Sequence, residues 1–198
     1  WGFCFYLVRY GDIILAATNN GLYEIENNSS QIILKNEYIN YILPSKSSGL
    51  FYIGTDRGIT AIKREKNKWV EYPKIRPKGF NDPVYTIAED ENRNIWLGND
   101  NEVLHLVIGK NLSTISFEMY DFGNEYPEKF SIRLIDNSIF FLSSGQIYRF
   151  NTSNNKIEPN NLLVFNKFPL QKYLVSQYNI SWLQNQSAWI CETDRIKP

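Results

Sequence analysis

The sequence predicts an all-β fold, a β-propeller built from four-stranded antiparallel blades. Three observations predict it: a motif that recurs five times in 198 residues, short runs in which consecutive residues are all apolar, and an aromatic content of 15%. Aromatic side chains pack well on a pleated surface, so this composition favours strands over helices. Hydrophobic residues make up 43% of the chain, which is enough for a substantial core.

The recurring motif is an apolar run, a small residue, a polar turn and a second apolar run. Its five copies are 13–25, 51–62, 94–106, 138–150 and 187–197. Their turns lie 37, 44, 44 and 49 residues apart, which matches the period of a propeller blade and exceeds that of a leucine-rich or ankyrin repeat. We therefore expect each copy to form a hairpin at the centre of a blade.

The aligned copies agree column by column. One column holds only large residues, Leu15, Tyr52, Trp96, Phe140 and Trp189. The next column is apolar as well, and neighbouring residues in a strand point to opposite faces, so both faces of the hairpin must be covered. We expect the large column to pack between blades, not to form an aromatic platform for sugars. Gly54 and Gly98 close two of the runs, where a small residue suits a close approach of backbones.

Short segments before and after each hairpin complete the blades. They are 3–9, 38–43, 84–90 and 130–136 before the hairpins, and 68–72, 114–122 and 161–165 after them. The expected blades lie near 1–35, 36–72, 83–121 and 130–165, with a half blade at 172–198. A ring cannot close on half a blade, and propellers carry roughly four to eight blades. We therefore expect about four and a half blades of a larger propeller, with about seven blades as our estimate for the whole ring.

Charge and cysteine content narrow the function classes. Lys plus Arg and Asp plus Glu both number 21, so no net field favours nucleic acid or an anionic membrane surface as a partner. No apolar segment approaches the roughly 20 residues that span a bilayer. The only methionine, Met119, lies inside the chain, so we expect sequence upstream. Cys4 and Cys191 could be bonded if the chain ends meet, but we expect buried thiols that pack as small apolar groups.

The residues offer no catalytic, cofactor or metal site. The only histidine, His105, shares its column with Glu24, Ala61 and Arg149, and we expect a solvated strand residue there. One histidine and two distant cysteines provide no metal-ligand spacing. Acidic residues such as 89–91 cluster in turns, where Asp90 is expected to accept hydrogen bonds from backbone amides. The fragment is therefore predicted not to be an enzyme.

Two long connectors between blades are the predicted ligand-binding region. They span 73–83 and 121–130, and long loops on a rigid framework are the usual place for binding. Their candidate ligand-binding residues are Arg76, Lys78, Phe80 and Tyr126, a mixture of rings and hydrogen-bonding groups that suits sugars or uronates. The alternative is that the two rings anchor the loops and the two cations are solvated.

Residues 84–106, VYTIAEDENRNIWLGNDNEVLHL, resemble the two-component-regulator propeller repeat. That repeat has an apolar strand, an acidic turn, then Ile-Trp-Ile-Gly-Thr, two polar residues and Gly-Leu. The matching positions are Asp90, Trp96 and Gly98 in the third copy, Gly54, Thr55 and Gly58 in the second, and Thr18, Gly21 and Leu22 in the first. The fourth copy lacks the Gly-Thr pair, and the fifth has Cys191 where Gly is expected.

The resemblance implies a ligand-sensing extracytoplasmic module of a bacterial hybrid histidine kinase of the Bacteroidetes type. It implies a module that detects oligosaccharides or another small molecule and signals across the inner membrane through a transmembrane helix outside this chain. The implied partners are the remaining propeller blades and a second copy, since the parent is expected to be a homodimer; the implied location is periplasmic. Two alternatives stay open: a protein-interaction propeller in secretion or cell-surface assembly, and a carbohydrate lyase or hydrolase.

The strand assignment can be tested at Thr55, which ends a predicted central strand. We expect Thr55→Pro to give insoluble protein, because the imide removes a backbone donor from the sheet. Soluble yield and thermal unfolding measure the effect, and a variant as stable as the parent would contradict the blade assignment.

Overall fold

The computed structural model describes residues 2–100, 102–121, 131–135, 138–143 and 146–160, and beyond residue 160 the backbone of strand segments. Apart from one short 3₁₀ turn, η1 (Pro73–Ile75), every regular element in these residues is a β-strand. The strands form five four-stranded antiparallel sheets and one pair, β17 (Val164–Phe165) with β18 (Phe168–Pro169). The described segments contain no helix that could cross a bilayer. The predicted all-β fold of four-stranded blades is confirmed.

Each four-stranded sheet, hereafter a blade, keeps its strands in chain order. The first blade contains β1 (Cys4–Tyr10), β2 (Ile13–Thr18), β3 (Gly21–Glu26) and β4 (Ser29–Lys35). The second contains β5 (Ile39–Pro44), β6 (Leu50–Thr55), β7 (Gly58–Glu65) and β8 (Lys68–Glu71). The third contains β9 (Thr86–Glu89), β10 (Ile95–Gly98), β11 (Glu102–Ile108) and β12 (Thr114–Asp121). The fourth contains β13 (Ser131–Ile135), β14 (Ser138–Ser143), β15 (Gln146–Asn151) and β16 (Lys156–Pro159), and the fifth β19 (Tyr173–Val175), β20 (Ile180–Gln184), β21 (Ser187–Glu192) and β22 (Arg195–Lys197).

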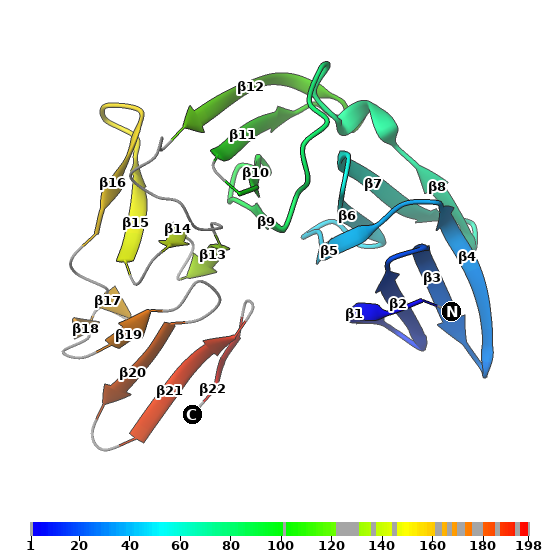
Figure 1. The fold of residues 1–198 in the computed structure, drawn as a ribbon, viewed down its shortest axis with the longest axis horizontal. Helices are drawn as coiled ribbons and strands as arrows, with labels where there is room; N and C mark the ends of the chain where they lie inside the picture. The colour runs from blue at the N-terminus through cyan, green and yellow to red at the C-terminus, as the bar shows by residue number, and fades with distance from the viewer. Residues whose placement is uncertain are drawn as a thin grey trace.

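The blades follow an arc around a common axis (Figure 1). In the first four blades the first strand is innermost (Figure 1), and β1 contacts β5, β5 contacts β9, and β9 contacts β13. The last strands, β4, β8, β12 and β16, lie on the outer rim (Figure 1). Each hairpin of the repeat therefore occupies the middle two strands of its blade, as predicted for the first four copies.

The fifth blade differs from the expected half blade at 172–198. It is a complete four-stranded sheet in which β21 and β22 are the third and fourth strands. Its second strand is β20, whose sequence ISWLQ contains the Trp-Leu pair also found in β10, IWLG. The fifth copy of the motif was thus aligned one strand too late, because the second Trp of this blade, Trp189, resembles the motif as well as Trp182 does. The side chain of Trp189 lies outside the described residues.

The outer strand of the fourth blade also differs from the expectation. We predicted it at 161–165, whereas β16 (Lys156–Pro159) pairs with β15. The polar segment 152–155 allows a tight hairpin directly after β15, and Asn155 takes the positive φ of 57° that such a turn needs. Ile157 then packs against the core of the blade, which favours the early pairing.

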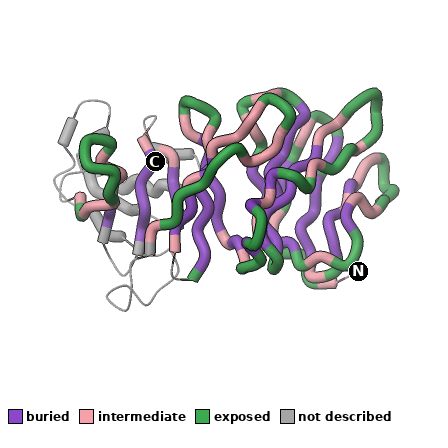
Figure 2. The backbone as a smooth tube through the Cα atoms, turned by 90° about the horizontal axis from the view of Figure 1, so that it is seen from above, coloured by how far each residue is buried: buried purple, intermediate pink, exposed green. Residues whose placement is uncertain are grey.

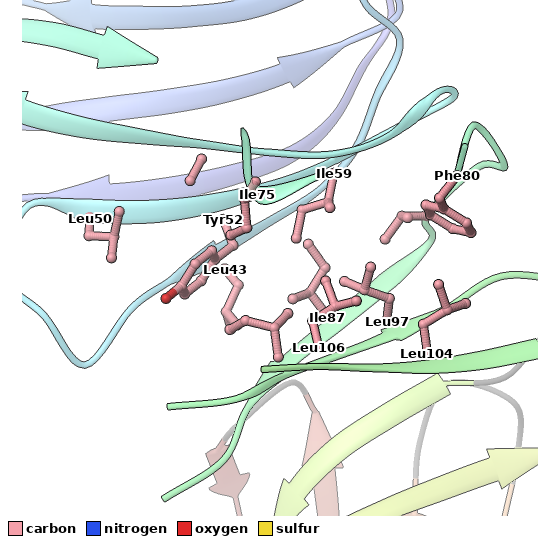
Figure 3. Packing of buried hydrophobic residues seen from close by; sticks show 13 residues of the cluster. Leu43, Leu50, Tyr52, Ile59, Ile75, Phe80, Ile87, Leu97, Leu104 and Leu106 are labelled. Atoms are coloured by element: carbon pink, nitrogen blue, oxygen red, sulfur yellow. The ribbon is translucent and has the colours of Figure 1, made fainter. Parts of the chain in front are cut away.

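Three apolar clusters join the first four blades, one at each junction. The cluster between the second and third blades includes Leu43, Tyr52 and Ile59 on one side and Leu97 and Leu104 on the other (Figure 3). Buried residues run along the strands, and exposed residues gather at the turns (Figure 2). The large column is buried as predicted, with exposed fractions of 0% at Leu15, 2% at Tyr52, 3% at Trp96 and 7% at Phe140. It is packing between blades and not a sugar platform.

Gly54, the small residue that closes the apolar run of the second copy, permits a close approach of two backbones. A Cβ atom on Gly54 would lie 2.7 Å from the carbonyl oxygen of Val84, closer than a side chain tolerates. Val84 lies just before β9 of the third blade, and its backbone amide donates to the carbonyl of Thr55 at 2.9 Å. Gly54 is therefore required by the junction between two blades, as its position in the motif predicted.

The first blade leaves one of its faces uncovered. Leu7 is 59% exposed and Ile14 is 37% exposed, whereas Ile42 and Phe51, at the corresponding positions of the second blade, are 0% and 2% exposed. Cys4, expected as a buried thiol, is exposed and free because it lies on this inner edge strand. The side chain of Cys191 lies outside the described residues.

A buried carboxylate adds a polar contact to the first junction. Glu24 is 4% exposed and comes from β3 of the first blade. It accepts hydrogen bonds from the Arg64 guanidinium and the Trp69 indole of the second blade, and from Gln31 at 3.0 Å. The Arg64 side chain is 16% exposed, so both charges of this ion pair are largely withdrawn from water. Removing either partner leaves the other charge without compensation.

We expect Glu24→Ala to lower the free energy of unfolding by about 3 kcal/mol, because it leaves the Arg64 guanidinium unpaired between two blades. Urea unfolding followed by fluorescence measures the loss. The matched control is Glu26→Ala on the same strand, for which we expect a change within about 0.5 kcal/mol. The double variant Glu24→Met with Arg64→Met should recover much of the stability; equal stability of Glu24→Ala and the parent would show that the ion pair is dispensable.

Candidate functional site

The connector between the second and third blades is held against the core. Its turn η1 places Ile75 with 0% exposure in the cluster between these blades, and Phe80 is 5% exposed in the same cluster (Figure 3). The connector is thus a rigid loop whose apolar residues point inward. Its polar residues are left on the loop face of the propeller, where the turn between β10 and β11 also emerges.

The four residues predicted to bind ligand differ in their surroundings. Phe80 is buried, so it cannot stack on a sugar. Its ring anchors the loop, as in the alternative stated for it. Arg76 is half-buried, donates from Nε to the carbonyl of Ile59 at 3.4 Å, and lies over Gly58. Lys78 is exposed, and Tyr126 lies outside the described residues. Arg76 and Lys78 therefore stay candidates, and Tyr126 stays a prediction that the described residues do not test.

A hollow of about 220 Å³ lies where the connector meets the turn between β10 and β11. Its lining residues are Asp82, Pro83, Asn99, Asp100 and Glu102. The backbone amide of Glu102 donates to Asn99 Oδ1 at 2.7 Å, and Asn99 Nδ2 donates to Glu102 Oε2 at 3.2 Å. Tyr85 donates its hydroxyl to Asp100 Oδ2 at 3.5 Å. These contacts orient a set of oxygen acceptors around the opening.

The sequence contained a signal for this hollow that we did not use. In each blade, the turn after the second strand and the connector to the next blade emerge on the same face. Asn99 and Asp100 in the turn and Asp82 in the connector could therefore have been grouped from topology alone. The prediction from rings and cations in the connectors did not include these acceptors.

Carboxylate and amide oxygens accept hydrogen bonds, so this hollow suits ligands that are rich in hydroxyl groups. Arg76 and Lys78 on the same connector supply cations for a ligand that carries a carboxylate. The described residues contain no group of three or more His, Cys, Asp and Glu side chains arranged to hold a metal ion.

A second hollow, of about 190 Å³, lies on the opposite face between the third and fourth blades. Asp90, Trp96, Arg149 and Phe150 are among its lining residues. The Trp96 ring is stacked on His105 at a centroid distance of 4.1 Å and meets Phe150 edge to face at 4.9 Å. Since both faces of the ring are covered and it is 3% exposed, this aromatic group serves packing.

Asp90 organises the turn beside that second hollow, as predicted. It accepts the Asn94 amide at 2.8 Å and the Trp96 indole at 3.4 Å. Burial works to raise the pKa of Asp90, but His105, Asn94 and Trp96 together outweigh burial and hold the pKa below its usual value. His105 Nε2 lies 3.8 Å from Asp90 Oδ2, which is long for a hydrogen bond. The expectation of a solvated His105 is wrong, because its side chain is packed and only 19% exposed.

Comparisons with known proteins agree with this architecture. Residues 78–101 match the family model described as two component regulator propeller. This segment contains four of the five residues that line the hollow, which are Asp82, Pro83, Asn99 and Asp100. A search of the curated proteins finds no match.

Several solved structures share the fold. The extracellular domain of a protein named as a one component system, BT4673 from Bacteroides thetaiotaomicron, is 20% identical with a TM-score of 0.62, over 99% of this chain and 28% of that chain. The extracellular domain of a protein named as a hybrid two component system, BT3049 from the same organism, is 13% identical with a TM-score of 0.62, over 94% and 27%. Virginiamycin B lyase from Staphylococcus aureus is 16% identical with a TM-score of 0.60, over 98% and 71%.

The chain spans little more than a quarter of the length of the first two of these structures. At these identities the likeness establishes the fold, while the family match establishes the repeat. The chain is therefore a β-propeller protein that carries the two component regulator propeller repeat at residues 78–101, from the end of the connector through β9 and β10.

Proposed function

We propose that this chain is part of a ligand-sensing, extracytoplasmic propeller of a bacterial two-component regulator, and that the ligand is an oligosaccharide. The observation that carries the proposal is the overlap of the family match at 78–101 with the hollow of oxygen acceptors on the loop face. Two of the structures that share the fold are extracellular domains of proteins named as one- and two-component systems. By this proposal the chain lies in the periplasm and is tethered to the inner membrane through another part of its parent.

The geometry supports recognition by hydrogen bonding to hydroxyl groups. Asp82, Asp100 and Glu102 present carboxylate oxygens at the hollow, and sugar hydroxyls are suitable donors to them. A ligand bound there contacts a loop whose buried residues are already fixed, so little ordering entropy opposes binding. Lys78 is exposed on the same connector and would favour a ligand that carries a uronate group.

We expect neutral or uronate-containing oligosaccharides to raise the unfolding temperature of the purified chain, and isothermal titration calorimetry to give their affinity. The double variant Asp82→Asn with Asp100→Asn should weaken binding by about tenfold or more, because two charged acceptors are lost. The matched control is Asp12→Asn, an exposed residue in the turn between β1 and β2 on the opposite face. Lys78→Ala should weaken binding of a uronate ligand and leave a neutral one unchanged.

Three outcomes would contradict the proposal. Binding that is equally strong in the double variant would remove the hollow from the site. Accumulation of shortened or unsaturated sugar products would favour the lyase or hydrolase alternative. Binding to no oligosaccharide, together with capture of a defined surface protein, would favour the interaction-module alternative.

A further inference from the structure

Two aromatic rings lie exposed where the innermost strands of the first two blades begin. Phe5 is 48% exposed and Tyr38 is 40% exposed. Their rings stack on each other with centroids 5.1 Å apart and planes inclined by 21°. Each ring therefore covers part of the other and keeps open surface toward the solvent. These two residues are hereafter the aromatic pair.

The strand register places the aromatic pair on the loop face. The first residue of β1 pairs with Thr18 and the first residue of β5 pairs with Thr55, and both threonines directly precede turns of that face. A register shift between Cys4 and Tyr6 leaves Phe5 without a strand partner. Such irregularities redirect a side chain, and here the ring meets the second blade. Its exposure therefore differs from that of the uncovered face of the first blade, which is turned away from the second blade.

The aromatic pair is fixed in place by contacts within the chain. Tyr38 donates its backbone amide to Asp56 Oδ1 at 3.3 Å, and its carbonyl accepts the Asp56 amide at 3.1 Å. Two further rings of the same strands, Tyr6 and Tyr41, are stacked at a centroid distance of 5.3 Å. Two aromatic stacks thus connect the first two blades near the beginnings of β1 and β5, so a ligand that binds to the aromatic pair loses little affinity to ordering.

Polar side chains border the aromatic pair. Asp56 and Arg57 lie in the turn between β6 and β7, and their side chains are 44% and 63% exposed. A sugar ring has an apolar face of C–H groups and a rim of hydroxyl groups. An open aromatic ring suits that face, and a carboxylate and a guanidinium suit the rim. This combination favours a pyranose ring over a purely apolar group, which would leave the polar side chains unused.

The same turn connects the aromatic pair to the hollow that Asp82 lines. Gly58 directly follows the turn, and Arg76 of the connector lies over Gly58 and donates to the carbonyl of Ile59 at 3.4 Å. The connector then continues along the chain from Arg76 to Asp82. The aromatic pair, the turn, the connector and the hollow therefore adjoin in this order along the loop face, from the first blade to the third.

We propose that the aromatic pair is a second subsite for the oligosaccharide that binds at the hollow, and that it stacks on one pyranose ring. This inference rests on the proposed function and narrows its ligand class to oligosaccharides long enough to reach from the hollow across Arg76 to the aromatic pair. Asp56 accepts hydrogen bonds from the hydroxyl groups of the stacked sugar, and Arg57 donates to its oxygens. A short oligosaccharide occupies one subsite, whereas a long one gains both.

Calorimetric titration with hexamers and dimers of β-1,4-linked glucose, β-1,4-linked xylose and α-1,4-linked galacturonate tests the subsite. The hexamer that binds best should bind at least about tenfold more tightly than its dimer, because it occupies both subsites. Tyr38→Ala should weaken hexamer binding about tenfold and reduce this difference, whereas Tyr38→Phe keeps the ring and most of the affinity. The matched control, Phe117→Ala, removes a ring of equal exposure (40%) from the outer strand β12 and should leave binding unchanged. Thermal unfolding verifies that the variants are folded.

The outcomes distinguish this subsite from the proposed function. If Asp82→Asn with Asp100→Asn weakens hexamer binding while Tyr38→Ala and Phe5→Ala bind like the parent, the subsite is wrong and the sensing function stands. Equal affinities for hexamer and dimer in the parent would also overturn the subsite. Loss of a protein partner, and not of a sugar, in Tyr38→Ala would assign the aromatic pair to the interaction-module alternative. Binding of no sugar in the panel would overturn both the subsite and the proposed ligand.

Discussion

The fold depends on one constraint: each blade is apolar on both faces and must be covered on both. The clusters at the three described junctions contain most of the buried apolar residues, and each draws on two neighbouring blades. A single four-stranded sheet of this composition would expose the apolar residues of both its faces to water, so a blade is stable only when neighbouring blades cover it. On the face of the first blade that is turned away from the second blade, no described blade provides cover, and Leu7 and Ile14 are exposed.

Polar contacts decide how the blades meet, since apolar surface alone does not fix an angle. Glu24 bridges the first junction through Arg64 and Trp69. At the second junction, Glu89 accepts the Ser45 hydroxyl at 3.0 Å and the Lys46 amide at 2.8 Å. Burial there, with the Glu89 charge nearby, raises the pKa of Tyr52 to about 12, so this phenol stays neutral and packs as an aromatic ring. Each buried carboxylate is satisfied by the adjoining blade, which favours one alignment of the pair over alternatives.

The sequence predicted those features of the fold that follow from strand periodicity. Apolar residues on both parities at 95–97 required cover on both faces, and Gly54 marked the close approach to Val84. Periodicity could not distinguish Trp182 from Trp189 as the centre of the fifth blade, because both lie in apolar runs of similar length. It also could not place β16, whose position depends on the turn at 152–155.

The candidate site was less predictable, because loop residues carry no period. Whether Phe80 faced a ligand or the core depended on where η1 turned the connector, and the burial of Ile75 settles that direction. A ring near a proline-rich turn has the same sequence appearance in either case. The acidic hollow, in contrast, depended on which turns share a face, and this follows from strand order. Topology was therefore the better guide to the site than residue type.

The hollow lies at one end of the sheet of the third blade, and this position determines what a bound ligand could move. Glu102 lines the hollow, begins β11, and pairs with Asp121 at the end of β12. A hydrogen-bonded ladder of this kind is stiff, so it can carry a displacement from the loop face to the rim. Stiffness alone does not create two states, however, and coupling between sites requires an element with two arrangements of similar free energy. The described junctions are packed in one arrangement, so the ladder by itself supplies the stiffness of a switch and not its two states.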